Sequence, residues 1–133
     1  MSLSIGIDLQ DVADIESALA RFGEDYLARV FTSAEIDACG PGIDVRRLAA
    51  CFAAKEASRK ALAVDDEALG WRAVEVLLTD RGAAQVELTG GAAELAAQRG
   101  VVSIVVSTSI GRTHASAIAL AELRRSSARE RET

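Results

Sequence analysis

The sequence predicts an α+β fold in which an antiparallel sheet packs against a long helix. Three patterns lead to this prediction. Residues 4–9 and 101–123 alternate apolar and polar side chains as strands do, residues 73–89 have a hairpin pattern, and residues 45–62 space apolar side chains as a helix does. A chain of 133 residues has the length of one domain. We therefore expect one core between the sheet and the long helix.

The first strand is expected in SIGIDL, residues 4–9, where three aliphatic side chains alternate with Ser4, Gly6 and Asp8. This period of two is typical of a half-buried strand. It places Asp8 near the end of the strand.

Three helices are expected next. Residues 10–22 space apolar side chains at helical intervals, and Gly23 supplies a stop. A short helix is expected in residues 25–31. Thr32 then caps a third helix in residues 33–38, because a glutamate lies three positions after it in the capping-box arrangement.

The long helix and a hairpin follow. Residues 39–44 contain the only proline and break the chain before the long helix. Residues 73–80 and 85–89 alternate at period two around the sequence DRGA, in which Gly82 is free to adopt a positive φ. These residues are expected to form two antiparallel strands.

The last third of the chain predicts a helix, two strands and a tail. A helix is expected in residues 92–99, and strands are expected in residues 101–110 and 113–123. We assign residues 1–123 to one domain. Residues 124–133 form a charged tail with nothing to bury, which we expect to be disordered.

Composition restricts the function and the location. The formal net charge of -5 argues against a general affinity for nucleic acid or anionic lipid. Cys39 and Cys51 have neither metal-ligand spacing nor the density of a disulfide scaffold, so free thiols in a reducing compartment are expected. The N-terminus has no secretory pattern, and no segment approaches the ~20 apolar residues of a membrane span. We predict a cytoplasmic protein that binds neither nucleic acid nor membranes.

The charged part of the long helix suggests a site. On a helical wheel Glu56 falls near the centre of the apolar stripe, Lys60 lies near its edge, and Lys55 points more to the side. A carboxylate in such a position is costly unless a cation or a proton compensates it. Glu56 and Lys60 could instead form an ordinary exposed pair at i and i+4, because alanine surrounds the helix and blurs its buried face. The pattern alone leaves both interpretations open.

Asp8 is the candidate for a second carboxylate. Asp8 could simply cap a helix. If it meets Glu56, however, the two carboxylates could bind a hard divalent ion. Mg²⁺ commonly uses one or two protein carboxylates and completes its shell with water and substrate phosphates. This pair therefore indicates a phosphate-handling site.

Several segments resemble a known family. GIDLQDVADI (6–15), YLARVFTSAEI (26–36) and FAAKEASRKAL (52–62) stand in the order and spacing of the holo-acyl-carrier-protein synthases, the short class of 4'-phosphopantetheinyl transferases. Residues 79–96 resemble the hairpin and following helix of that family, and residues 106–122 resemble its closing pair of strands. The resemblance thus covers nearly the whole predicted domain.

The resemblance implies an activity and an assembly. The family transfers the phosphopantetheine arm of coenzyme A to a serine of an acyl carrier protein, and it forms homotrimers with active sites in the clefts between subunits. By this resemblance Asp8 and Glu56 would hold Mg²⁺ on the coenzyme A diphosphate. Lys60 would neutralise the phosphate charge that develops in the transition state. These three residues are the predicted catalytic residues.

The same resemblance suggests further contacts to coenzyme A. Arg46 and Arg47 lie early in the long helix, where they could meet coenzyme A phosphates or simply face water, and we favour Arg46. Lys55 belongs to the Ala-Ala-Lys-Glu-Ala motif. Ser107 and Ser109 belong to the last motif of the family, which reads serine, any residue, serine or threonine, then histidine. We predict that Arg46, Lys55, Ser107 and Ser109 bind coenzyme A.

The chain also departs from the family. Ile110 stands where the last motif has histidine, Cys51 stands where arginine is usual, and Ser58 stands where an aromatic residue is usual. Each substitution removes an expected contact to coenzyme A. The helix after Asp8 carries three acidic residues before its first arginine, whereas the family commonly places basic residues there to meet the acidic carrier protein.

Two functions remain open. The first is an active, magnesium-dependent phosphopantetheinyl transferase with a specialised carrier-protein partner, which the presence of Asp8, Glu56 and Lys60 favours. The second is a family member that keeps the trimer and part of the metal site but has lost transfer, and acts as a binding or scaffold subunit or in other carrier-protein-linked chemistry. The substitutions at Ile110, Cys51 and Ser58 and the acidic helix after Asp8 favour the second function. We favour the first.

Overall fold

The computed structural model describes residues 2–64, 69–79 and 81–124, and its strands form a five-stranded antiparallel sheet with the order β1-β5-β4-β3-β2. The elements in chain order are β1 (Ser2–Asp11), α1 (Val12–Phe22), α2 (Glu24–Val30), α3 (Ser33–Ala38), α4 (Val45–Ala61), a short 3₁₀ helix (Trp71–Ala73), β2 (Val74–Leu78), β3 (Ala83–Leu88), α5 (Gly90–Gln98), β4 (Val101–Ile110) and β5 (His114–Leu123).

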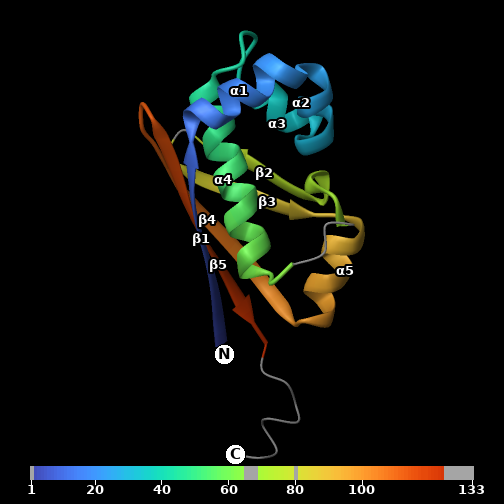
Figure 1. The fold of residues 1–133 in the computed structure, drawn as a ribbon. Coiled ribbons are helices and arrows are strands. Elements are labelled where there is room, and N and C mark those ends of the chain that lie inside the picture. The colour runs from blue at the N-terminus through green and yellow to red at the C-terminus, as the bar shows by residue number, and fades with distance from the viewer. Residues whose placement is uncertain (1, 65–68, 80, 125–133) are drawn as a thin grey trace, which may run out of the picture.

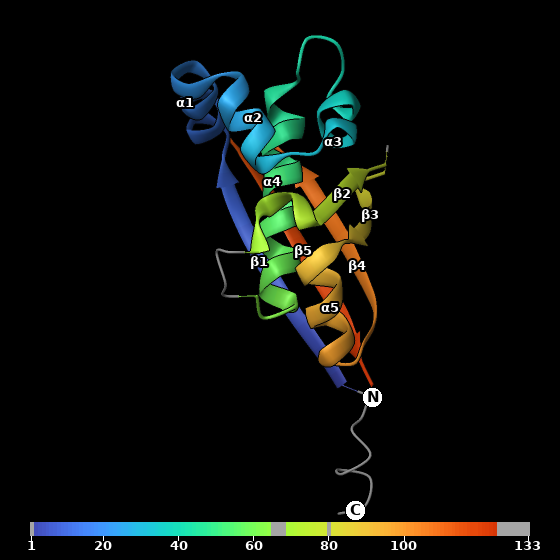
Figure 2. The same ribbon diagram turned by 90° about the vertical axis from the view of Figure 1, so that its right-hand side faces the viewer.

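Helix α4 covers one face of the sheet and runs along the long strands β1, β5 and β4 (Figure 1). The short helices α1, α2 and α3 gather at one end of this layer, and α5 lies beside β4 at the other end (Figure 2). The predicted α+β fold, an antiparallel sheet packed against a long helix, is confirmed.

Local signals in the sequence placed several element boundaries correctly. Thr32 Oγ1 accepts a hydrogen bond from the Glu35 N–H at 3.2 Å, and Glu35 Oε1 accepts one from the Thr32 N–H at 2.8 Å. The capping box of α3 is therefore complete. Gly82 has a φ of 81° between β2 and β3, as the hairpin prediction required.

Helix α4 covers the side of β1 that carries Gly6, and it does not cover the aliphatic side. Gly6 is buried against α4, and a Cβ atom at this position would lie 2.7 Å from the Ala61 backbone nitrogen, with the Ala57 carbonyl in the same space. The glycine thus lets the helix backbone approach the strand closely. The polar side of the alternation, which includes Asp8, therefore faces the helix.

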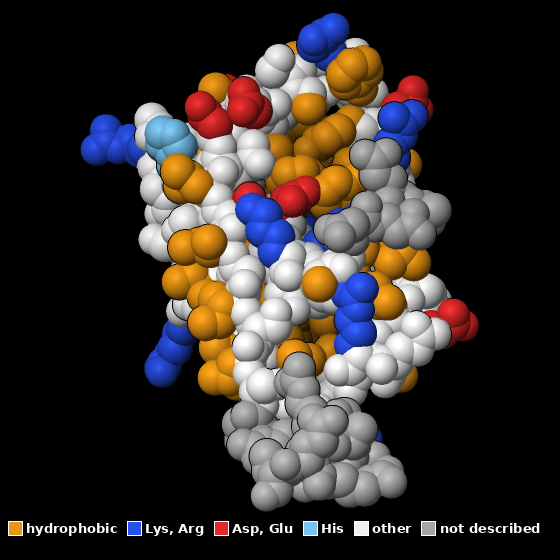
Figure 3. Space-filling view, turned by 60° about the horizontal axis from the view of Figure 1, so that its bottom comes forward, with side chains coloured by type: hydrophobic (Ala, Val, Ile, Leu, Met, Phe, Trp, Pro, Cys, Tyr) orange, Lys and Arg blue, Asp and Glu red, His pale blue; other side chains and the backbone are white. Residues whose placement is uncertain are grey.

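The aliphatic side of β1 lies on the outer face of the sheet, where it is exposed in the described part of the chain. Leu3, Ile5, Ile7 and Leu9 are each more than half exposed, between 54% and 67%. Ile118 of the neighbouring strand β5 pairs with Ile7 and is also half exposed. Such apolar side chains gather along one flank of the molecule in Figure 3. We call this surface the outer apolar face.

Two further expectations concern the ends of the chain and the membrane. Apart from Arg124, the charged tail expected at residues 124–133 lies outside the described residues. Across the described ranges, no helix combines the length and the apolar character that crossing a membrane requires.

Candidate active site

Asp8 and Lys60 meet where β1 passes α4. Lys60 Nζ donates hydrogen bonds to Asp8 Oδ1 at 3.2 Å and to the Ile7 carbonyl at 2.9 Å. The side chain of Asp8 is 16% exposed and that of Lys60 is 52% exposed. The pair is therefore anchored on the backbone of β1 and still accessible to a ligand.

Glu56 adds a second carboxylate from the preceding turn of α4. Partial burial raises the pKa of Glu56, and the negative charge of Asp8 raises it further, whereas Lys60 and Arg59 act in the opposite direction. Two carboxylates that repel each other in this way favour a bound cation. The structure thus brings together the three residues that were predicted to be catalytic.

This carboxylate pair suits a hard divalent cation. Oxygen ligands are those that Mg²⁺ prefers, and it commonly takes only one or two carboxylates from a protein. Within the described ranges, no group of three or more His, Cys, Asp or Glu side chains could hold a metal ion. An ion held by Asp8 and Glu56 would therefore take its other ligands from water or from a substrate.

Lys55 lies away from this cluster, in the core. Its side chain is 0% exposed, and its Nζ donates hydrogen bonds to Glu35 Oε1 at 2.8 Å, to Glu35 Oε2 at 2.9 Å and to the Val74 carbonyl at 2.7 Å. Glu35 Oε2 also accepts a hydrogen bond from the Val76 N–H at 2.7 Å. These partners occupy the ammonium fully, so we assign Lys55 to the core and withdraw the predicted contact with coenzyme A.

Sequence comparisons support the family resemblance. A profile of the 4'-phosphopantetheinyl transferase superfamily matches residues 4–120. The chain is 42% identical over 126 residues to the holo-[acyl-carrier-protein] synthase of Desulforudis audaxviator strain MP104C, and the match covers 91% of this chain and 93% of that relative. It is 39% identical over 124 residues to the synthase of Moorella thermoacetica, with coverages of 90% and 94%. The chain belongs to the 4'-phosphopantetheinyl transferase superfamily.

Solved structures of the superfamily share the fold. The Chronobacterium ammoniagenes ACPS–CoA complex has a TM-score of 0.80 at 26% identity, over 94% of this chain and 100% of that chain. The Helicobacter pylori holo-[acyl-carrier-protein] synthase in complex with coenzyme A has a TM-score of 0.77 at 27% identity, over 89% and 99%. These findings confirm the resemblance, and with the named relatives they confirm the prediction of an enzyme of the transferase type.

Two of the departures from the family lie inside the core. Cys51 is buried, its Sγ donates a hydrogen bond to the Val76 carbonyl at 3.5 Å, and burial raises the pKa of its thiol well above the usual value. Ser58 is also buried, and its hydroxyl has no hydrogen-bond partner in the described part of the chain. Both side chains therefore contribute to packing within the chain, and neither offers a surface contact.

The other predicted ligand contacts lie apart from the carboxylates of the same chain. Thr108 pairs with the buried Ala117 on the helix side of the sheet, so the neighbouring Ser107 and Ser109 point to the outer face. Arg46 is exposed in the first turn of α4, where Asp44 caps its backbone N–H. One chain alone does not bring these three side chains to Asp8.

A further surface feature of this superfamily member, an apolar groove, was not predicted from the sequence. The groove has a volume of about 470 Å³ and lies between α1, α2 and α4. Four of the five aromatic residues of the chain line it: Phe22, Tyr26, Phe52 and Trp71. Because the sequence has so few aromatic residues, a comparison of their positions could have indicated that they gather at one place. Phe52, which lines the groove, lies one turn before Glu56 on α4.

Proposed function

We propose that this chain transfers the 4'-phosphopantetheine arm of coenzyme A to a serine of an acyl carrier protein in a Mg²⁺-dependent reaction. The observation that carries the proposal is the cluster of Asp8, Glu56 and Lys60 in a member of this superfamily. Relatives of the chain are named holo-[acyl-carrier-protein] synthases, and two solved neighbours contain coenzyme A.

The proposed reaction is a phosphoryl-type transfer. The serine oxygen of the carrier protein forms a bond to the phosphorus that bears the pantetheine arm, and the bond from this phosphorus to the bridging oxygen of the diphosphate breaks. Adenosine 3',5'-bisphosphate leaves with the bridging oxygen. Such reactions depend mainly on positioning and on charge stabilisation.

The side chains of the cluster have distinct proposed roles. Asp8 and Glu56 would hold Mg²⁺, which supplies charge neutralisation on the diphosphate. Lys60 has a flexible, half-exposed ammonium that can turn from Asp8 to a phosphate oxygen of the substrate. Before substrate binds, the hydrogen bond to the Ile7 carbonyl holds this ammonium beside the site.

We also propose that the chain functions as a homotrimer. The outer apolar face is larger than the scattered apolar residues of a typical monomer surface, and a second copy of the chain would bury it. Ser107 and Ser109 lie on the same side of the sheet as this face. Association would therefore carry them towards a neighbouring subunit, in agreement with active sites between subunits.

The carrier protein is proposed to dock at the apolar groove beside Glu56. The groove offers aromatic surface next to the site where the serine must react. Asp14 and Glu16 on α1 are exposed, so this helix presents negative charge beside the groove, whereas Asp25 and Arg29, which line the groove, offset each other. A strongly acidic carrier protein would be repelled here. We therefore propose a specialised, less acidic carrier protein as the partner.

The second candidate function is that of a binding or scaffold subunit without transfer activity. It rests on Ile110, which is 42% exposed at the end of β4 and has no group that can hydrogen-bond to a phosphate. The accessible carboxylates and Lys60 favour the active transferase. We further propose a cytoplasmic location, with which the two free, buried cysteines agree.

Intact mass spectrometry tests the proposed function. The protein is incubated with Mg²⁺, coenzyme A and a panel of apo carrier proteins that range from strongly acidic to near neutral. We expect the mass of a phosphopantetheine arm on at least one carrier protein. No transfer to any member of the panel would favour the scaffold function.

Substitution of the carboxylates identifies the site. Asp8→Ala or Glu56→Ala removes a direct metal ligand, so the loss of Mg²⁺-dependent transfer should exceed the ~10–100-fold cost of losing an outer-shell partner. Glu24→Ala, an exposed acidic residue of α2, is the control and should transfer normally. Normal transfer by both carboxylate variants would exclude the proposed metal site.

A further inference from the structure

The turn that ends α4 contains a residue in an unfavourable conformation. The Ala63 N–H donates a hydrogen bond to the Lys60 carbonyl at 3.0 Å. The Val64 N–H donates one to the Arg59 carbonyl at 2.9 Å. These two hydrogen bonds form a Schellman motif, in which the residue after the helix cap is left-handed and is usually glycine. Here that residue is Ala63, with a φ of 54°, so its surroundings must offset the steric cost.

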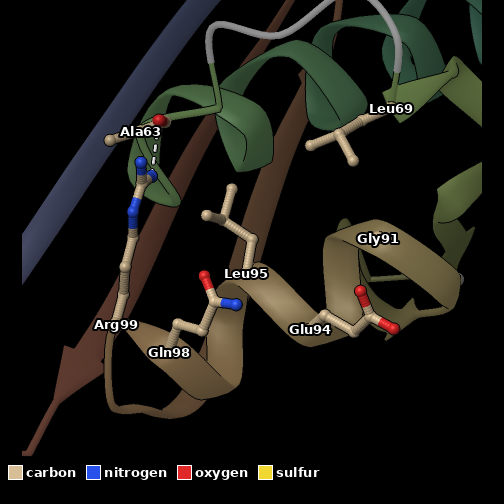
Figure 4. A pocket seen from close by; sticks show the side chains of 7 residues that line it. All are labelled: Ala63, Leu69, Gly91, Glu94, Leu95, Gln98 and Arg99. Atoms are coloured by element: carbon tan, nitrogen blue, oxygen red, sulfur yellow. Dashed lines mark hydrogen bonds between the residues drawn. The ribbon is translucent and has the colours of Figure 1, made fainter.

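Arg99 offsets this cost from the end of α5. Its guanidinium donates hydrogen bonds to the Leu62 and Ala63 carbonyls, which follow the last turn of α4. Arg99 and Ala63 face each other along a pocket of about 320 Å³ between the end of α4 and α5 (Figure 4). Carbonyl groups at the C-terminus of a helix lack intrahelical partners and carry partial negative charge, so a cationic donor stabilises them. Arg99 therefore closes the end of α4.

The backbone that carries this guanidinium is itself held in place. The Arg99 N–H donates a hydrogen bond to the Leu95 carbonyl at 3.0 Å, and the next residue, Gly100, accepts one from the Arg124 N–H at 2.7 Å after β5. Ala96 of α5 is buried. The side chain of Arg99 thus reaches α4 from an element that is fixed to the sheet.

Lys60 lies in the turn that Arg99 closes. Its carbonyl accepts the hydrogen bond from the Ala63 N–H, and its ammonium contacts the Ile7 carbonyl at 2.9 Å and Asp8 Oδ1 at 3.2 Å. The last turn of a helix frays most readily, because half of its backbone groups lack intrahelical partners. Opening of this turn would move the backbone of Lys60 and withdraw its ammonium from Asp8.

We propose that Arg99 is a positioning residue that acts through Lys60. It holds the left-handed turn at Ala63, and this turn keeps the ammonium of Lys60 beside Asp8. Arg99 has no direct contact with the substrate in this arrangement. The inference rests on the proposed role of Lys60 in phosphopantetheine transfer, but the effect of Arg99 on the turn can be measured without transfer.

Hydrogen exchange, followed by mass spectrometry of overlapping peptides, measures the stability of the turn. In Arg99→Met we expect the amides of residues 62–64 to exchange roughly tenfold faster than in the wild type. Arg99→Met/Ala63→Gly should recover most of the slow exchange, because glycine adopts a positive φ without strain. Arg72→Met removes the same charge from an exposed position of the 3₁₀ helix and should exchange as the wild type does. Circular dichroism verifies the fold of each variant.

Acetylation reports directly on the ammonium of Lys60. The chain contains only two lysines, and Lys55 is fully buried, so an N-hydroxysuccinimide ester of acetic acid distinguishes Lys60 among the lysine side chains. We expect Lys60 to react roughly fivefold faster in Arg99→Met, because its hydrogen bonds to β1 are weakened, and to regain the slow rate when Ala63→Gly is added. Unchanged acetylation in a folded Arg99→Met protein would overturn the inference, even if exchange in the turn is faster.

Transfer kinetics connect the turn with the proposed reaction. Arg99→Met should lower kcat about tenfold and change the KM for coenzyme A less, because Lys60 is proposed to act on charge that develops in the transition state. In a Lys60→Met protein the same substitution should have no further effect, because both side chains act through one ammonium. An equal loss in both backgrounds would assign Arg99 to general stability and overturn the inference. A wild type that never transfers would overturn the proposed function, and exchange and acetylation would still decide whether Arg99 positions Lys60.

Discussion

At the scale of single residues, Lys55 and Lys60 lie five positions apart on α4 and have opposite environments. Lys55 is fully buried against Glu35, whereas Lys60 is half exposed beside Asp8. Lys55→Met leaves the buried Glu35 carboxylate without a countercharge, so we expect the free energy of unfolding to fall by ~3–5 kcal/mol. Lys60→Met should change it by less than ~1 kcal/mol. Urea denaturation measures both values.

Comparison of Lys55→Met with Lys60→Met separates effects on stability from effects on activity. Lys60→Met should lower transfer sharply while the protein remains stable. The double variant Glu35→Leu/Lys55→Met should recover part of the stability that Lys55→Met loses, because no buried charge remains. Wild-type stability of Lys55→Met would contradict the placement of this side chain in the core.

The pH dependence of stability is expected to report on Glu56. Its pKa is raised in the folded protein, so folding disfavours the carboxylate form. The resulting destabilisation is present above the raised pKa and disappears as the pH falls below the ordinary value, where Glu56 is protonated in both states. Without metal, Glu56→Gln should therefore unfold at a higher temperature than the wild type at pH 8. Solvent screens this half-buried group, so the gain should be only ~0.5 kcal/mol.

Thermal melting at pH 8 and pH 4 without metal checks this expectation. The two proteins should converge at pH 4, and saturating Mg²⁺ at pH 8 should stabilise only the wild type. A Glu56→Gln protein that is less stable than the wild type at pH 8 would show that Glu56 is not held in an unfavourable charged state.

The wheel pattern located Glu56 and Lys60 better than it located Lys55, for a physical reason. Most of the 17 residues of α4 are buried, and they lie on several sides of the helix. The reason is that the sheet, including β2, and the short helices surround it. An alanine-rich helix in such a position has no single apolar stripe. The partner of Lys55 is Glu35, 20 positions away, and no local pattern could indicate that contact.

At the scale of elements, the site depends on how closely α4 approaches β1. Gly6 has no side chain, and the backbone of α4 occupies the space that a Cβ atom would need. Gly6→Ala should therefore lower the free energy of unfolding by ~1–3 kcal/mol or more and move Lys60 away from Asp8. Mg²⁺-dependent binding of coenzyme A should weaken in the same variant. Ser4→Ala, on the same side of the strand, is the control, and equal stability of the two variants would contradict the close packing.

Strand β1 also shows why the elements could be predicted while their packing could not. The alternation in residues 4–9 predicted the strand correctly, but an alternation does not state which partner covers the apolar side. Here the helix covers the side with Gly6, because a small residue allows close contact, and Ile5 remains on the outer apolar face. In the same way, the spacing predicted the strands of the last motif but not that Ser107 and Ser109 point away from α4.

At the scale of the whole molecule, the outer apolar face leads to a prediction about assembly. Ile5 is 64% exposed in the middle of this face, where it pairs with Leu120 of β5. Ile5→Glu places a charge in the surface that a neighbouring subunit would bury, and burying an unpaired charge is costly. We expect light scattering to give the mass of a trimer for the wild type at micromolar concentration and that of a monomer for Ile5→Glu. Phe22→Glu, a similarly exposed residue of α1, should remain trimeric.

The monomeric variant then tests whether the active site is shared. Ile5 lies away from Asp8, Glu56 and Lys60, and its side chain points to the opposite face of β1, so the carboxylate cluster of each chain should stay intact in Ile5→Glu. If Ser107 and Ser109 act on a ligand that the carboxylates of another subunit hold, the monomer loses transfer although it folds. A folded monomer that transfers at the wild-type rate would place the complete site within one chain, and a wild type that is itself monomeric would contradict the trimer directly.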